Sequence, residues 1–78
     1  MLNNNDILRR LRYALNETDQ RFIEVFALKG QEMSQQQLRA YLGKEDEDGT
    51  VECPDEILGI FLDGLIIDRR GPPKTAAP

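Results

Sequence analysis

The stretch PDEILGIFLDGLIIDRRG, residues 54–71, decides the fold expected of this chain. It starts with a proline and two acidic residues and ends with two arginines and a glycine, which are signals of a helix start and a helix end. Between these ends apolar residues cover most of the circumference, and only Glu56, Gly59 and Asp63 mark a polar side. A helix this apolar is expected at the centre of a bundle or against a second chain.

Two glycines, Gly59 and Gly64, lie inside this predicted helix, where each costs roughly 1 kcal/mol relative to alanine. We expect close approach of a neighbouring helix in return. We also expect self-association through this helix and part of the second helix. The candidate interface residues are Phe61, Leu62, Leu65 and Ile66.

Three shorter helices are predicted from apolar residues at helical spacing, at about residues 6–15, 19–28 and 35–42. Their ends carry local signals. The candidate N-caps are Asn4 or Asn5 for the first helix, Thr18 for the second and Ser34, in a capping box with Gln37, for the third.

No strand signal competes with this helical pattern, so the predicted fold class is all-α. We expect a small compact bundle of four helices with the apolar C-terminal helix at its centre. Residues 1–70 form the predicted helical domain, and residues 71–78 form a predicted flexible, proline-rich tail. A foldable part of roughly 70 residues supports only a marginal core, so burial against a partner would help.

The composition excludes several classes of protein. Hydrophobic residues make up 40% and charged residues 31% of the chain, which is typical of a globular domain and not of a disordered one. No apolar run is long enough to span a membrane, and the N-terminus lacks the pattern of a signal peptide, so we expect a cytoplasmic protein with no membrane partner. The single cysteine rules out an internal disulfide, and the absence of histidine removes the commonest general base and transition-metal ligand.

Charge is distributed unevenly along the chain. The net charge is −4, of which residues 1–43 carry +1 and residues 44–78 carry −5. An acidic chain repels nucleic acid at long range, although a local basic face can still bind weakly.

Four blocks of sequence carry a resemblance to a known family: Asn4–Leu15, Lys44–Asp46, Cys53–Asp55 and Phe61–Ile67. In this order they resemble the YehS-like family, a bacterial domain-of-unknown-function family (family number 1456), over about residues 2–71. The resemblance implies no activity. Members of this family typically hold two copies of the unit in tandem, whereas only one copy is present here. A symmetric dimer could mimic a tandem pair.

A basic and aromatic face is predicted on the first helix, formed by Arg9, Arg12 and Tyr13. Arginines at this spacing can bind phosphates, and tyrosine can stack on a base. Arg39 lies on a glutamine-rich third helix, which could contact DNA in the manner of a helix-turn-helix motif. The alternative is a solvated amphipathic face and an ordinary αα-hairpin, which the acidic charge and the long turn between the helices favour.

An acidic loop is predicted at residues 45–49, with a turn at Asp48-Gly49. Its glycine fits the spacing of a calcium loop. However, Lys44 occupies the first ligand position and the bidentate glutamate is missing, so no metal is expected.

Two further residues receive structural assignments. Asp63 lies in the most apolar helix, and a buried carboxylate needs a partner, so we predict an ion pair with Arg9, Arg10 or Arg12. Cys53 is predicted to be a small buried apolar residue, because neighbouring acids oppose its thiolate and no histidine can activate it.

The sequence contains no set of catalytic residues and no cofactor motif. The leading hypothesis is a non-enzymatic protein-interaction module that forms a homodimer or binds an unknown protein partner. The alternative is a weak nucleic-acid-binding regulator.

Overall fold

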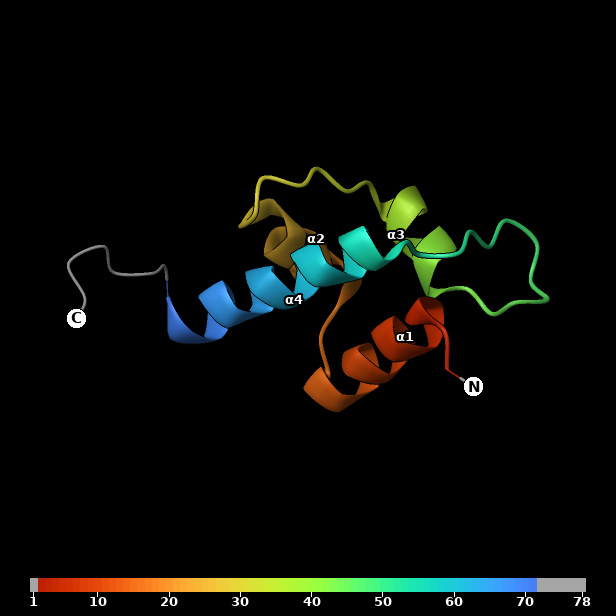
Figure 1. Cartoon of the computed structure of the whole chain (residues 1–78), viewed down its shortest axis with the longest axis horizontal. Coiled ribbons are helices and arrows are strands. Elements are labelled where there is room, and N and C mark those ends of the chain that lie inside the picture. Colours follow the sequence, from red (N-terminus) through yellow and green to blue (C-terminus); the bar gives the residue numbers. More distant parts are fainter. Residues whose placement is uncertain (1, 72–78) are drawn as a thin grey trace.

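The computed structural model describes residues 2–71 and contains four helices, which confirms the predicted all-α bundle. They are α1 (Asn4–Leu15), α2 (Asp19–Ala27), α3 (Gln35–Leu42) and α4 (Asp55–Arg70), and the described residues contain no strand. Figure 1 shows α4 crossing in front of α2, with α1 below it and the loop after α3 at the opposite end from the C-terminus of α4. The predicted tail, apart from Gly71, lies outside the described residues.

Local capping explains where three of the helices begin. Ser34 and Gln37 form the predicted capping box, and Thr18 caps α2 as expected. The cap of α1 corrects the prediction: it is Asn3, whose side chain accepts from the Asp6 amide at 2.8 Å while Asp6 accepts from the Asn3 amide at 3.1 Å. Asn4 and Asn5 therefore lie inside α1 with their side chains free for other partners.

The core is built around three phenylalanine rings. Phe22 and Phe26 of α2 lie 4.4 Å and 5.2 Å, between ring centroids, from Phe61 of α4, and all three are almost completely buried. Leu8 of α1 and Leu38 of α3 belong to the same core. Each buried Phe or Leu of this kind contributes roughly 1.5–3 kcal/mol.

The longest helix, α4, meets the rest of the chain mainly along α2 and more briefly along α1. Of its 16 residues only Phe61 and Gly64 are fully buried. Gly64 confirms the expected close approach, because a β-carbon there would collide with the backbone oxygen of Val25. The remaining apolar residues of α4 are half-buried or exposed, so this helix packs through one face.

Candidate functional site

The four predicted interface residues divide between the two sides of α4. Phe61 belongs to the core, which corrects its assignment to an interface, because its ring fills the space between Phe22 and Phe26. Leu65 is half-buried against the same core. Leu62 and Ile66 are 39% and 56% exposed, and these two remain available to a partner.

We call the solvent-facing side of α4 the outer face and define it by Asp55, Gly59, Leu62, Ile66 and Arg70. These residues are spaced three or four apart, so they line up along one side of the helix. The apolar pair lies in the middle, and charged residues stand at both ends. Unlike Gly64, Gly59 has no atom of a neighbouring element within 4 Å of a β-carbon built on it.

The predicted ion pair of Asp63 is not formed. Asp63 is exposed and takes part in no salt bridge within residues 2–71. The carboxylate of α4 that does pair is Asp68, one and a half turns later, whose Oδ1 lies 2.7 Å from Nη2 of Arg21 in α2. Asp68 lies on the inner side of the helix and Asp63 at the edge of the outer face, which is why only Asp68 reaches a partner within the chain.

Arg21 binds two further acids, since its side chain also lies 2.6 Å from Glu24 and 3.7 Å from Glu17. The hydrogen bonds that Arg21 donates to Asp68 and to Glu24 raise the pKa of Arg21 above its ordinary value. This cluster joins the end of α4 to α2. Arg69 extends it, with its Nη2 atom 3.5 Å from Glu17.

The arginines proposed for nucleic-acid contact mostly have partners within the chain. Arg9 forms a salt bridge with Asp6 and donates to the backbone oxygens of Leu42 at 3.1 Å and Gly43 at 2.7 Å. The hydrogen bond from the Asn3 amide, together with Arg9, holds the pKa of Asp6 below its ordinary value. Arg9 thus connects α1 to the end of α3.

Arg12 and Arg39 meet at one carboxylate, that of Asp19 at the start of α2. Arg12 Nη1 lies 2.6 Å from Asp19 Oδ1, and Arg39 Nε lies 3.5 Å from Asp19 Oδ2. The structure therefore brings these two predicted site residues together, but around an acid of the same chain. Tyr13 is 78% exposed, apart from this cluster.

Sequence reasoning missed a set of hydrogen bonds at the start of α1, which we call the asparagine clasp and define by Asn4 and Asn5. Asn5 is buried, donates to the backbone oxygens of Val51 at 2.9 Å and Gly43 at 3.3 Å, and accepts from the Cys53 amide at 2.7 Å. Asn4 donates to the Cys53 oxygen at 2.9 Å and to Asp55 at 2.7 Å.

The asparagine clasp holds both ends of the segment between α3 and α4 against α1. In the sequence, the only sign of these hydrogen bonds was the Asn4-Asn5 pair in the first block of the family resemblance. This pair had been assigned as the helix cap, which is Asn3 instead. The predicted Asp48-Gly49 turn is present, with Gly49 at φ +80°. Residues 44–49 are all exposed, and within residues 2–71 no group of three His, Cys, Asp or Glu side chains is placed to hold a metal ion.

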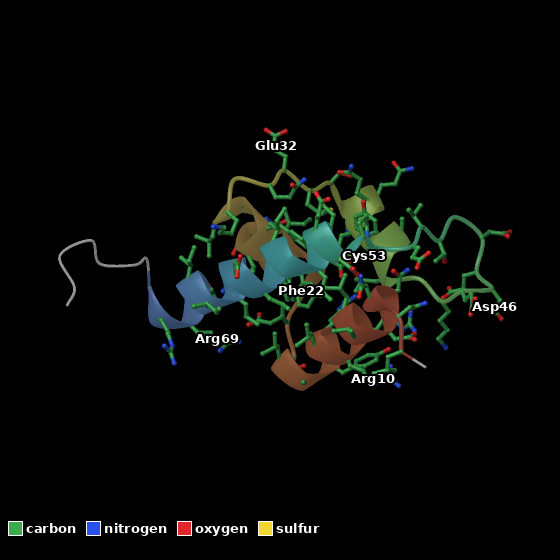
Figure 2. All side chains as sticks on the ribbon, in the orientation of Figure 1. Arg10, Phe22, Glu32, Asp46, Cys53 and Arg69 are labelled. Carbon is green, nitrogen blue, oxygen red and sulfur yellow. The ribbon has the colours of Figure 1, made fainter. Side chains whose placement is uncertain are left out.

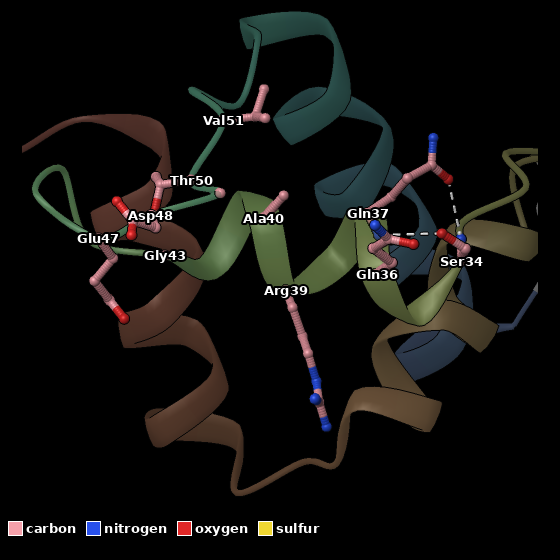
Figure 3. Close-up of a pocket in the computed structure, with 11 residues that line it drawn as sticks. Ser34, Gln36, Gln37, Arg39, Ala40, Gly43, Glu47, Asp48, Thr50 and Val51 are labelled. Carbon is pink, nitrogen blue, oxygen red and sulfur yellow. Dashed lines mark hydrogen bonds between the residues drawn. The ribbon is translucent and has the colours of Figure 1, made fainter.

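An open pocket of about 540 Å³ lies between α3 and this acidic loop. Figure 3 shows Glu47, Asp48 and Thr50 on one side of it, while Arg39 points away from them. Ser34, the serine on its rim, is occupied by its capping-box hydrogen bonds with Gln37. The pocket therefore combines two exposed carboxylates with amides and contains no paired nucleophile and base.

Cys53 is buried as predicted, immediately before α4. Burial raises the pKa of its thiol to about 11, so the sulfur stays protonated near neutral pH. A protonated, buried thiol is a poor nucleophile and a poor metal ligand.

Comparison with known proteins agrees with the resemblance. Residues 4–71 match the family described as "Protein of unknown function (DUF1456)". The chain belongs to this family. Its similarity to "Uncharacterized protein YehS" of Escherichia coli (strain K12) is 42% identity over 72 residues, which cover 92% of this chain and 46% of that protein. The DUF1456 chain thus spans about half the length of the curated relative it matches.

No solved structure matches the chain significantly. No described helix has both the length and the hydropathy needed to cross a membrane. Two of the blocks that carried the family resemblance meet at the asparagine clasp: the start of α1 and the segment before α4.

Proposed function

We propose that this DUF1456 chain is a non-enzymatic, cytoplasmic protein-interaction module that self-associates through the outer face of α4. The observation that carries the proposal is the exposure of Leu62 and Ile66 in the middle of this face, on the longest helix of the bundle. Burial of these two side chains is worth roughly 25 cal/mol per Å² of apolar surface, and a domain of this size has few other sources of stability.

The chemistry of the described residues supports a binding role over catalysis. The buried thiol is held protonated, the serine is used as a helix cap, and the carboxylates are either paired with arginine or exposed to solvent. None of these groups is poised as a nucleophile or general base.

The nucleic-acid hypothesis has weaker support. Three of its four residues already contact groups of the same chain, and releasing Arg12 or Arg39 would leave Asp19 with less charge compensation. Tyr13 and Arg10 are exposed, but a single exposed basic and aromatic pair supplies few phosphate contacts.

The test is the molar mass of the chain in solution, measured by light scattering from low micromolar to millimolar concentration. We expect a concentration-dependent dimer for the wild type and a monomer for Ile66→Asp, because a carboxylate in an apolar interface must be desolvated. Leu28→Asp, which changes another exposed apolar residue at the end of α2, serves as the matched control and should leave the dimer intact. A wild-type chain that stays monomeric over this range would refute the proposal.

Circular dichroism and thermal unfolding should accompany each mass measurement. Ile66 is more than half exposed, so Ile66→Asp should remain helical and unfold cooperatively. A folded monomeric variant beside a dimeric wild type is the result that supports the proposal.

A further inference from the structure

The outer face contains a glycine that the fold of one chain does not require. Gly59 is helical, without the positive φ that favours glycine, and a β-carbon there would have open space around it. Glycine inside a helix is nevertheless unfavourable by comparison with alanine. Gly59 thus adds no side chain to the outer face, on which Leu62 and Ile66 are exposed.

Charge along α4 runs from acidic to basic. Its first turn carries Asp55 and Glu56, and its last turn carries Arg69 and Arg70. Glu56 and Arg70 are exposed and form no salt bridge among residues 2–71. Figure 2 shows that Asp46, on the acidic loop, and Arg69 lie toward opposite ends of the molecule. The acidic end of α4 and the acidic loop therefore lie on one side, and the basic end lies on the other.

The acidic start and basic end of α4 are complementary to those of a second copy whose α4 runs in the opposite direction. We infer that two copies of the chain pair with their α4 helices antiparallel, so that Ile66 of each copy packs over Gly59 of the partner subunit and the Arg69-Arg70 end of each faces the Asp55-Glu56 end of the other. This inference rests on the proposed self-association and specifies its geometry and its partner, a second copy of this chain.

One alignment satisfies all of these contacts at once. If residue 66 lies opposite residue 59, then residue 70 lies opposite residue 55, and the two-fold axis passes between residues 62 and 63. The two Leu62 side chains then meet at the axis. Such an interface is isologous, since each copy presents the same residues to the other. The contact runs along a helix of 16 residues, or about 24 Å.

A parallel arrangement is disfavoured by the same charges. It would place Asp55 and Glu56 opposite their own copies and the two arginines opposite theirs, and like charges in contact are destabilising. It would also place Gly59 opposite its own copy and leave a gap there. In the antiparallel pair, Ile66 of the partner subunit fills this space. The antiparallel pair additionally opposes the two helix dipoles.

Spin labels test the orientation directly, in the full chain with Cys53→Ala as background. A label at position 63, in Asp63→Cys, should lie next to its copy and broaden the spectrum. A label at position 56, in Glu56→Cys, should lie about 20 Å or more from its copy, since 13 helical residues separate positions 56 and 69. A short separation at position 56, in a chain that light scattering shows to be a dimer, would overturn the antiparallel geometry and leave self-association standing. A monomeric chain would refute both.

A charge exchange tests the register. Asp55→Lys and Arg70→Glu, at positions that lie opposite each other in this alignment, should each raise the dimer dissociation constant about threefold to tenfold at low salt, because each loses two attractive contacts per dimer and gains two repulsive ones. The double variant should return to within about twofold of the wild type, since the same pairs re-form with their signs exchanged. A double variant as weak as the sum of its single variants would overturn this register.

Discussion

Both sides of α4 carry large apolar residues, but the two sides differ in what these residues contact. The inner side has Phe61 between two phenylalanine rings and Gly64 against the backbone of Val25. The outer face has Leu62 and Ile66 in solvent and Gly59 beneath open space. Packing within one chain accounts for the inner side, whereas on the outer face it involves only Asp55, which accepts a hydrogen bond from Asn4. This difference is the physical reason for assigning the outer face to a second copy.

The largest expected effect separates the neighbours Phe61 and Leu62. Phe61→Ala should lower the free energy of unfolding by about 3–5 kcal/mol, because it removes a buried ring and leaves a cavity between Phe22 and Phe26. Leu62→Ala should cost the monomer less than about 1 kcal/mol. Chemical denaturation at concentrations below the dimer dissociation constant measures both. Equal losses would remove the distinction between the two sides.

The same substitution at the two glycines of α4 should change the stability of the chain with opposite sign. Gly64→Ala should destabilise the chain by about 1–3 kcal/mol, since its methyl group collides with the backbone of Val25. Gly59→Ala should stabilise the monomer by about 0.5–1 kcal/mol through helix propensity.

Gly59→Ala should also weaken self-association, because the added methyl group occupies the space meant for Ile66 of the partner subunit. Thermal unfolding at low concentration and a dissociation constant from sedimentation separate these two effects. A Gly59→Ala chain that is more stable and dimerises as well as the wild type would contradict the proposed register.

The stability of the chain should also depend on pH in alkaline solution, because the thiol of Cys53 lies buried just before α4. Its folded pKa, about 11, is raised above the ordinary value of 9.0, so its contribution to stability is complete below pH 9 and is lost as the pH rises toward 11. At pH 10 the loss should be about 1 kcal/mol. The control is Cys53→Ala, whose stability profile should lack this component. If the stability of the wild type and of Cys53→Ala changed in parallel between pH 9 and 11, the thiol would not be buried as the structure has it.

The smallest effect concerns the two carboxylates Asp63 and Asp68. Asp68→Asn should cost about 0.5–1 kcal/mol, because it weakens the partly buried pair with Arg21. Asp63→Asn should change the stability of the monomer by no more than a few tenths of a kcal/mol. The loss for Asp68→Asn should shrink in high salt, which denaturation at two ionic strengths can measure. A larger loss of stability for Asp63→Asn than for Asp68→Asn would show that Asp63, and not Asp68, lies on the inner side of α4.

The interface prediction was wrong for Phe61, which is buried in the core, and it stays a prediction for Leu62 and Ile66, which are exposed. Helical spacing shows that apolar residues cover most of the circumference of α4, but not which part of it the other helices cover. Asp63 was misassigned for the same reason, since it was expected inside from its apolar neighbours and the structure places it at the edge of the outer face. The asparagine clasp was missed because its partners lie 38 to 51 residues away along the chain.

The helical class, the four helices within residues 2–71 and most of their ends could be predicted from the sequence. These features depend on contacts between residues three or four apart, such as the Ser34–Gln37 capping box and the acidic start and basic end of α4. Only the tertiary structure decided which apolar residues became core, which arginines met Asp19, and how α1 holds the acidic loop. Those outcomes depend on how the helices rotate against one another, and rotation is set by packing among residues far apart in the chain.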